Sequence, residues 1–388
     1  MPYAIEPHKN KKNTLSFGKF YKPLQSVTPS ITPLTSRGNR DLKMTFEDQL
    51  NALIFFHLQE HSSGRHLLQE LKENQFARDY IAPNQGIEKS SFFEAINTRG
   101  LLQLLEILDA LQGEAHKVLP KEYTNLGDLT VIDGSLIDAT LSMYWADYRD
   151  GSKKAKIHLG FDVNHGIPRK IFLTDGKGDE RPFVSRIISP GQTGVLDRYY
   201  QCHANFDQWQ EDEKHFVCRI KTNTIKTLIT PYEVNPDSIV FYDALVLLGT
   251  KGVNRTEKPL RVIGYKVDNV NYWVATDRFD LTSEEIASIY KLRWTIESFF
   301  AWWKRHLRVY HLIARSPYGL MVQILSGLIT YILLAIYCRE EFNEKVSIRR
   351  VRQLRINIYN ETRLMEKHDP HDLSWPKLNF GYPPYAIS

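Results

Sequence analysis

The sequence predicts an α+β protein of several domains, in which helical regions flank a central region rich in strands. Two observations lead to this prediction. Apolar residues recur with helical spacing from Thr45 to about Lys117, whereas short strand-like apolar runs dominate after Pro120. A long helical pattern then begins at Thr282, and the chain stays helical in character toward its C-terminus. A length of 388 residues is enough for two or three domains.

Residues 1–40 are expected to form a flexible basic arm. The segment contains several prolines, serines and threonines and shows no sustained apolar period. Lys9, Lys11 and Lys12 can contact phosphate, although a merely solvated tail is the more common role of such a run.

Residues 41–118 are predicted to form a helical N-terminal domain. Thr45 caps its first helix, Ser62-Ser63-Gly64 separates the first two helices, and Ser91 with Glu94 forms a capping-box pattern for a third. Short helices joined by polar turns allow a helix-turn-helix-like DNA reader, with SSFFEAINTR as the helix offered to the groove. A bundle that only packs is an equal alternative.

The central region reads as a series of strands. Leu129 to Ile132 is an apolar run that ends at Asp133-Gly134, and Gly194 to Leu196 is another that ends at Asp197. A hairpin is expected around Asn164-His165-Gly166. Further strands are predicted at 157–163, 169–174, 216–220, 238–248, 260–267 and 272–276, with a helix through Phe206 and Trp209.

The helix predicted from Thr282 to Arg308 carries the most distinctive polar residues. Thr282 and Glu285 form a capping-box pattern, and no Pro or Gly interrupts the segment. At about 100° of rotation per residue, one stripe of this helix holds four polar side chains. They are Tyr290, Arg293, Glu297 and Lys304. The alternative is an amphipathic helix with an ordinary ion pair on a solvated flank.

Charge and cysteine content suggest a protein of a reducing cytoplasm that has local basic clusters. The net charge is only +5, but seven Lys or Arg residues stand against two Glu between Lys345 and Lys367. Three isolated cysteines argue against a zinc knuckle and against a disulfide framework. No apolar leader is visible near the N-terminus, and the apolar run from Ile324 to Tyr337 is too short for a bilayer.

Two aspartates at strand ends and a glutamate on a later helix suit phosphodiester chemistry. Two divalent ions can activate the attacking oxygen and stabilise the leaving oxygen, and Mg²⁺ prefers carboxylate and water ligands. Spacing alone does not select Asp133, Asp197 and Glu297 from the other acids of the chain. The rivals are Asp138, Asp162, Asp175, Glu180 and Asp243.

These residues resemble the DDE transposases of bacterial insertion sequences, in the branch marked by a YREK signature. Tyr290, Arg293, Glu297 and Lys304 match the pattern YxxRxxxExxxxxxK without a gap. VIDGS resembles the first acidic motif of the family, and VLDRYY resembles the second, with Tyr199 at a position where glycine is common. The resemblance covers residues 120–320 firmly and the N-terminal part loosely.

The resemblance implies a ribonuclease H-like catalytic core over residues 120–320, with a β-rich insertion at 222–280 and a helical region at 321–388. Asp133, Asp197 and Glu297 are implied to be the catalytic, metal-binding acids, with Mg²⁺ as cofactor and Mn²⁺ as a substitute. They would cleave DNA at transposon ends and transfer the strand into target DNA.

The partners implied are transposon-end DNA and target DNA, with a homodimer in the synaptic complex and a nucleoid-associated location. Tyr290, Arg293 and Lys304 are implied to hold the DNA end. Trp303 is predicted to be core rather than a base-stacking residue. A domesticated, catalytically silent DNA-binding protein is the alternative, although such a protein has no need of the three acids.

Overall fold

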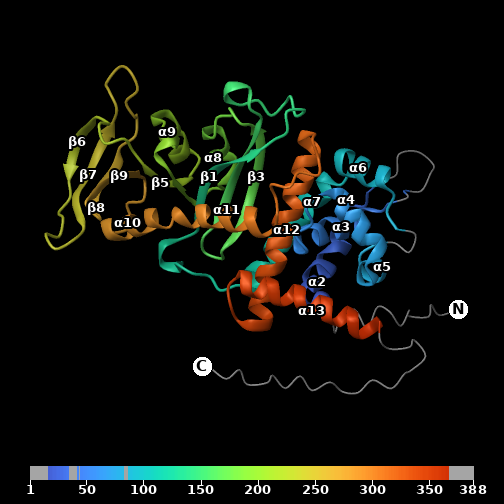
Figure 1. Ribbon diagram of the computed structural model, residues 1–388. Helices are drawn as coiled ribbons and strands as arrows, with labels where there is room; N and C mark the ends of the chain where they lie inside the picture. The colour runs from blue at the N-terminus through green and yellow to red at the C-terminus, as the bar shows by residue number, and fades with distance from the viewer. Residues whose placement is uncertain (1–15, 35–41, 43, 83–85, 367–388) are drawn as a thin grey trace.

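The computed structural model describes residues 16–34, 42, 44–82 and 86–366 (Figure 1). Within these residues one mixed sheet of nine strands has the order β3-β2-β1-β4-β5-β9-β8-β7-β6. β1, β4 and β5 are parallel to one another, and all other neighbours are antiparallel. The strands are β1 (Leu129–Asp138), β2 (Lys154–Asp162), β3 (Ile167–Asp175), β4 (Thr193–Leu196), β5 (His215–Arg219), β6 (Lys226–Pro231), β7 (Val240–Leu248), β8 (Leu260–Val267) and β9 (Val270–Thr276).

The β-rich stretch at 222–280 extends this same sheet. β9 pairs with β5, with Val217 opposite Thr276, and β8, β7 and β6 follow outward. Figure 1 shows these four strands at one end of the molecule. β7, β8 and β9 correspond to predicted strands, whereas β6 was not predicted from the sequence.

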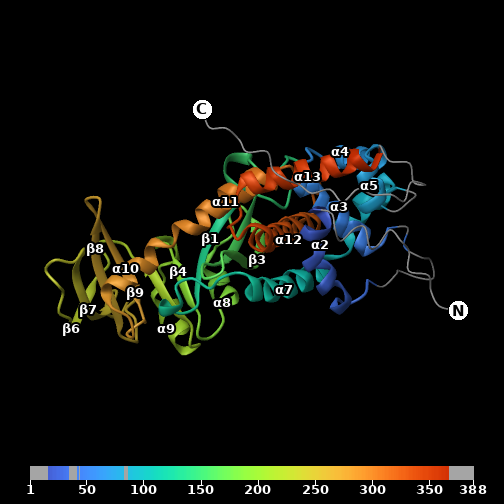
Figure 2. The same ribbon diagram turned by 90° about the horizontal axis from the view of Figure 1, so that it is seen from below.

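Helices cover both faces of the sheet. α8 (Arg181–Ile187) and α9 (His203–Glu211) lie on one face, and α10 (Ser283–Lys291) and α11 (Trp294–His306) run along the other (Figure 2). Successive strand residues point to opposite faces, so the apolar residues divide into two layers. Ile132, Leu196 and Phe216 pack with the α8–α9 layer. Val131, Val195 and Val217 pack with the α10–α11 layer.

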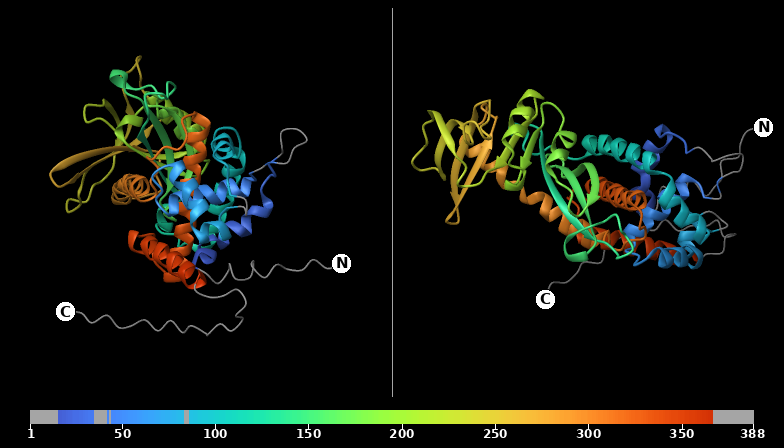
Figure 3. Two further views of the ribbon diagram at one scale, coloured as in Figure 1. Left: turned by 45° about the vertical axis from the view of Figure 1, so that its right-hand side comes forward. Right: turned by 90° about the horizontal axis from the view of Figure 1, so that it is seen from above.

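A helical bundle forms the other end of the elongated molecule (Figure 3). It comprises α2 (Ser16–Val27), α3 (Phe46–Leu58), α4 (Gly64–Glu73), α5 (Gln75–Tyr80), α6 (Lys89–Thr98), α7 (Leu101–Val118), α12 (Pro317–Phe342) and α13 (Ile348–Glu366). α12 contacts α2, α3, α6 and α7, and it also reaches β3. It is long and apolar enough to cross a membrane, but 89% of its apolar window is buried in the protein. α12 is therefore the core helix of the bundle, as predicted for the run that begins at Ile324.

Two predictions for the N-terminal part were wrong. The segment expected to be a flexible arm contains α2, which buries Phe17, Phe20 and Leu24 at helical spacing. That apolar spacing outweighs the prolines on which the prediction rested, and Lys9, Lys11 and Lys12 lie outside the described residues. The third helix begins at Lys89 rather than at Ser91, and the residue before it makes no side-chain cap.

The helix predicted from 282 to 308 is divided into α10 and α11. The capping box of Thr282 and Glu285 is present, which confirms the predicted start. At the junction, the amides of Leu292 and Arg293 bond to carbonyls only three residues back. Such a tightened turn shifts the rotation assumed for a single continuous helix. α11 ends at His306, and Arg308 then has a positive φ of 51°.

Candidate active site

Asp133 and Asp197 come from two neighbouring parallel strands. The pairing of β1 with β4 ends with Val131 opposite Val195, and the same register continued by two residues would bring Asp197 level with Asp133. Since alternate residues share a face, both aspartates follow these valines onto the side that α10 and α11 cover. Asp133 does not end its strand as predicted, because β1 continues to Asp138 on its ladder with β2.

The Asp133 carboxylate is largely buried, with two other carboxylates and one guanidinium nearby. Its side chain is 23% exposed, and its Oδ1 accepts a hydrogen bond of 2.8 Å from the amide of Gly134. Burial is the main cause that raises the pKa of Asp133 to about 7. The Gly134 amide and Arg293 lower this pKa, and the nearby carboxylates of Glu180 and Asp197 raise it. The folded protein therefore resists placing a full negative charge here without a cation.

Asp197 is held in place by its own backbone. It caps a single 3-10 turn, η4 (Arg198–Tyr200), and its carboxylate accepts a hydrogen bond from the amide of Tyr199. The cap fixes the direction of the carboxylate. Tyr199 itself is 57% exposed, so this residue in place of a glycine does not crowd the site.

Arg293 lies between Asp133 and Glu297. Its Nη2 lies 2.6 Å from Oε1 of Glu297, which stands in the first turn of α11, and its Nη1 lies 3.9 Å from Oδ2 of Asp133. Burial lowers the pKa of Arg293. The hydrogen bond and charge of Glu297, together with Tyr290 and Asp133, outweigh burial, so the pKa is raised. One guanidinium thus faces Asp133 from β1 and Glu297 from α11. Asp197 follows β4, the strand next to β1, and the ion pairs of this guanidinium within the described residues are with the other two acids.

The two remaining residues of the predicted stripe are engaged with the protein. Tyr290 is only 4% exposed and packs near Tyr272, and burial raises its pKa to about 12. Lys304 Nζ donates to Ser135 Oγ and to the carbonyl of Leu136, each at 2.6 Å. Burial lowers the pKa of Lys304. Lys304 therefore fastens α11 to β1 just beyond Asp133.

One acid that the sequence presented only as a rival lies beside the site. The carboxylate of Glu180 packs against the backbone of Gly134 and is contacted by Tyr200 and Lys156. The segment DGKGDE contains this residue, but no local pattern in the sequence pairs it with Tyr200 or Lys156. Contacts between residues twenty or more positions apart leave no periodic signal.

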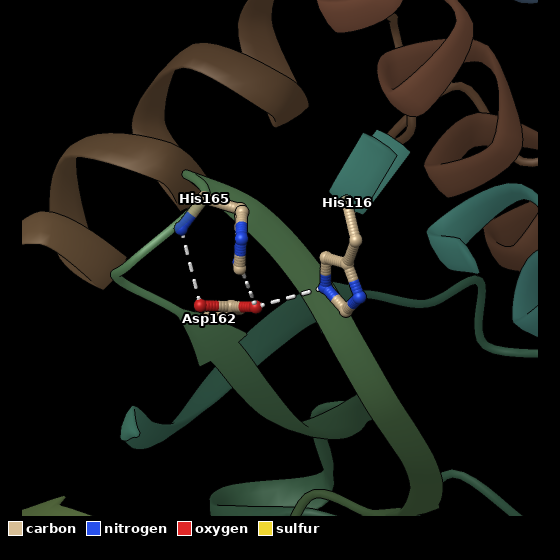
Figure 4. A group of neighbouring side chains, drawn as sticks. All are labelled: His116, Asp162 and His165. Carbon is tan, nitrogen blue, oxygen red and sulfur yellow. Dashed lines mark hydrogen bonds and ion pairs between the residues drawn. The ribbon is translucent and has the colours of Figure 1, made fainter. Parts of the chain in front are cut away.

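A different cluster, formed by His116, Asp162 and His165, has the composition of a metal site (Figure 4). The two histidines lie 3.1 and 2.9 Å from Oδ2 of the buried Asp162. Arg169 Nη2 lies 3.0 Å from the same oxygen, so a permanent cation already compensates this carboxylate. Burial raises the pKa of Asp162, but Arg169 and His165 outweigh it and the pKa is lowered. The cluster therefore ties α7 to the β2–β3 turn.

The other rival acids are also occupied elsewhere. Asp243 is buried and accepts two hydrogen bonds from Arg261, at 2.9 and 2.6 Å. Asp138 is exposed and pairs with Lys154 at 2.6 Å. Asp175 accepts from the amide of Lys177 at the end of β3. Within the described part of the chain, each of these three carboxylates therefore already has a partner away from Asp133.

Comparison with known proteins identifies a family for this chain. A sequence model of the family described as "Transposase DDE domain" matches residues 125–333, which contain Asp133, Asp197 and Glu297. That match covers more than half of the chain.

Three named proteins are also similar to this chain. "Probable transposase for insertion sequence element IS5377" of Geobacillus stearothermophilus is 28% identical over 211 residues, which are 53% of this chain and 55% of that protein. "Putative transposase y4zB" of Sinorhizobium fredii is 28% identical over 220 residues, 54% of this chain and 61% of that protein. "Putative transposase for insertion sequence element IS4SA" of Synechocystis sp. is 26% identical over 261 residues, 64% and 71% respectively. The chain thus spans only about half to seven tenths of the length of these curated relatives.

Proposed function

The chain belongs to the transposase DDE domain family, and from this premise we propose that it cleaves DNA at transposon ends and joins the freed strand to target DNA. The observation that carries the proposal is the convergence of Asp133, Asp197 and Glu297 on one face of the sheet. These acids come from the first strand, the end of the fourth strand and a late helix. Such positions support the finer proposal of a ribonuclease H-like core with the YREK signature.

The proposed chemistry is two-metal phosphoryl transfer, since the family implies the use of a divalent metal. The donor set fits Mg²⁺, because the three proposed ligands are carboxylates. Burial disfavours the charged form of Asp133 and raises its pKa, and a bound dication would offset that cost. Asp133, Asp197 and Glu297 would hold the ions. When bound, they would neutralise charge that develops on the phosphoryl oxygens and favour ionisation of the attacking water or hydroxyl. Mn²⁺, which accepts the same ligands, would substitute.

The protein's own residues would orient this site. The strands fix the two aspartates on adjacent backbones, while Arg293 turns Glu297 toward Asp133. Arg293 is also the residue best suited to clamp a phosphate of the transposon end, because a guanidinium can exchange one oxyanion for another. Tyr290 and Lys304, which we propose also serve the DNA end, would have to exchange protein contacts for DNA.

The proposed partners are transposon-end DNA, target DNA and a second copy of the chain in the synaptic complex. The N-terminal helices are a candidate DNA-binding region, and residues 222–280 a candidate insertion. The location that suits these partners is the bacterial nucleoid. In the alternative proposal the chain binds the same DNA but no longer cuts it.

A cleavage assay distinguishes the two proposals. The substrate is labelled duplex DNA that carries the inverted repeats flanking the gene, incubated with Mg²⁺ or with EDTA. We expect wild type to nick the repeat end only with the metal, and Glu297→Gln to bind the DNA equally but to cut at least about 100-fold more slowly. Asp138→Asn is the matched control, because it removes an exposed carboxylate from the same strand as Asp133.

If wild type binds the DNA without any nicking, the alternative proposal of a DNA-binding protein without cleavage activity is favoured. Undiminished cutting by Glu297→Gln would refute the assignment of the third acid, whatever the metal dependence.

A further inference from the structure

Glu180 occupies an unusual place beneath the proposed site. It precedes α8, but its side chain makes no capping hydrogen bond to that helix. Instead its carboxylate reaches β1, where a Cβ added at Gly134 would stand 2.5 Å from the carboxyl carbon. No other residue type fits at 134 without displacing Glu180, since real Cβ atoms do not approach other atoms so closely.

The carboxylate of Glu180 is held from two sides. The buried hydroxyl of Tyr200 donates to its Oε2 at 2.9 Å, and Lys156 Nζ lies 3.2 Å from its Oε1. The side chains of Glu180 and Lys156 are only 15% and 11% exposed. A carboxylate so enclosed and so well bonded is fixed in position, because releasing it would leave buried polar groups without partners.

These contacts connect the two strands that carry the aspartates. Gly134 follows Asp133 directly, and because strand residues alternate, its missing Cβ points to the face opposite the Asp133 side chain. Tyr200 lies three residues after Asp197, at the end of η4. The β1–β4 ladder has already ended at Val131, so Glu180 supplies a link between the two backbones where the ladder supplies none.

We propose that Glu180 is a positioning residue that, from the opposite face of the sheet, sets the spacing between Asp133 and Asp197 at which they hold a divalent ion. This inference rests on the proposed function, because it concerns the same site. It predicts that the packing of Glu180, more than its charge, matters for metal affinity.

Binding of Mn²⁺ to the DNA-free protein, followed by electron paramagnetic resonance, tests the inference without an activity readout. Glu180→Ala is expected to weaken binding at the site about tenfold or more, in the range found for residues that support metal ligands. Glu180→Gln is expected to remain within about threefold of wild type, because its amide oxygen still accepts from Tyr200. Asp179→Asn, a loss of the neighbouring exposed carboxylate, is the control.

A compensating pair of substitutions adds a second test that does not depend on one variant. Gly134→Ala forces a methyl group against Glu180 and is expected to weaken Mn²⁺ binding by about tenfold as well. In the Glu180→Ala background the same methyl group meets no carboxylate, so its additional effect should largely disappear. Circular dichroism and thermal unfolding verify that each variant is folded at the assay temperature.

The possible results separate the two proposals. If Asp133→Asn lowers Mn²⁺ binding but Glu180→Ala does not, Glu180 has no positioning role and the proposed function stands. Equal losses in Glu180→Ala and Glu180→Gln, or additive effects in the double variant, would also overturn the positioning role. If Asp133→Asn leaves Mn²⁺ binding unchanged, the proposed metal site falls and this inference falls with it.

Discussion

His57 stands at the joint between the helical bundle and the helix that carries Glu297. It is fully buried in α3, with Nδ1 2.6 Å from the carbonyl of Leu307, directly after α11. Its Nε2 lies 3.1 Å from the carbonyl of Gln323 in α12. Burial lowers the pKa of His57 from 6.5 to about 4, more than the two carbonyls raise it. Acidification should therefore loosen this joint.

The direction in which pH changes the stability follows from the pKa of His57 in the unfolded and in the folded protein. In the unfolded chain the imidazole takes up a proton near pH 6.5, whereas in the folded protein it does so only near pH 4. The unfolded state thus binds more protons between these values, so stability is lost as the pH falls from 6.5 to 4. Two to three pKa units correspond to about 3 kcal/mol in total, of which about 2 kcal/mol is lost by pH 5.

Urea unfolding at pH 7.5 and pH 5.0 measures this loss, with circular dichroism and tryptophan fluorescence as two probes. His57→Gln cannot titrate, so its stability should fall by about 2 kcal/mol less than that of wild type over this interval. His66→Gln, a change at a partly exposed histidine, is the control. The comparison uses the change between pH values, because the substitution also disturbs packing at every pH.

The explanation by His57 is refuted if wild type and His57→Gln lose the same free energy of unfolding between pH 7.5 and 5.0, within about 0.5 kcal/mol. The burial of a neutral imidazole would then not be the source of acid sensitivity at this joint.

Three further substitutions test other parts of the structure. In EDTA, Asp133→Asn should be more stable than wild type by up to about 4 kcal/mol at pH 8.5 and by less than about 1 kcal/mol at pH 4. An acid whose folded pKa is raised to about 7 destabilises the fold as the pH rises from its unfolded pKa through 7. Equal urea midpoints of the two proteins at pH 8.5 would contradict this. Asp243→Asn should lower the free energy of unfolding by about 3 kcal/mol or more, because it leaves the buried Arg261 without its carboxylate partner. DNA cleavage at 20 °C should persist in this variant. Lys304→Met should lower the free energy of unfolding of the DNA-free protein by about 1–3 kcal/mol, because the Leu136 carbonyl loses the Lys304 donor. An unchanged free energy of unfolding would show that the contact of Lys304 with β1 does not stabilise the fold.

Local signals in the sequence predicted much of the fold. β8 has the bounds predicted for it, and the hairpin turn at Asn164 joins β2 and β3 as expected. Trp303 is fully buried, which confirms its prediction as core. These features depend on residues within a few positions of one another, so their patterns can be recognised without a structure. α2 was missed because prolines were weighed more heavily than its apolar spacing.

The candidate site was predictable only in part. The ends of apolar runs and the family resemblance selected Asp133 and Asp197. That the two aspartates lie level with each other, two residues beyond the last β1–β4 pair, depends on the register of β1 with β4, which the sequence does not show. Lys304 was expected to face DNA, whereas its ammonium group bonds to β1. Glu180 is placed by a tertiary contact with Gly134, 46 positions earlier in the chain. Long-range packing decides such positions, and a single sequence contains no direct record of it.

The position of Glu297 depends on both ends of the molecule. At its far end α11 is followed by Leu307, whose carbonyl is held by His57 from the bundle, and in its last turn Lys304 fastens it to β1. α12, which completes the bundle, begins only ten residues after Leu307. The N-terminal helices would therefore contribute to the proposed site even without touching DNA, because His57 holds the end of the helix that carries Glu297. Loss of cleavage after a change in the bundle is consequently no evidence of lost DNA binding unless binding itself is measured.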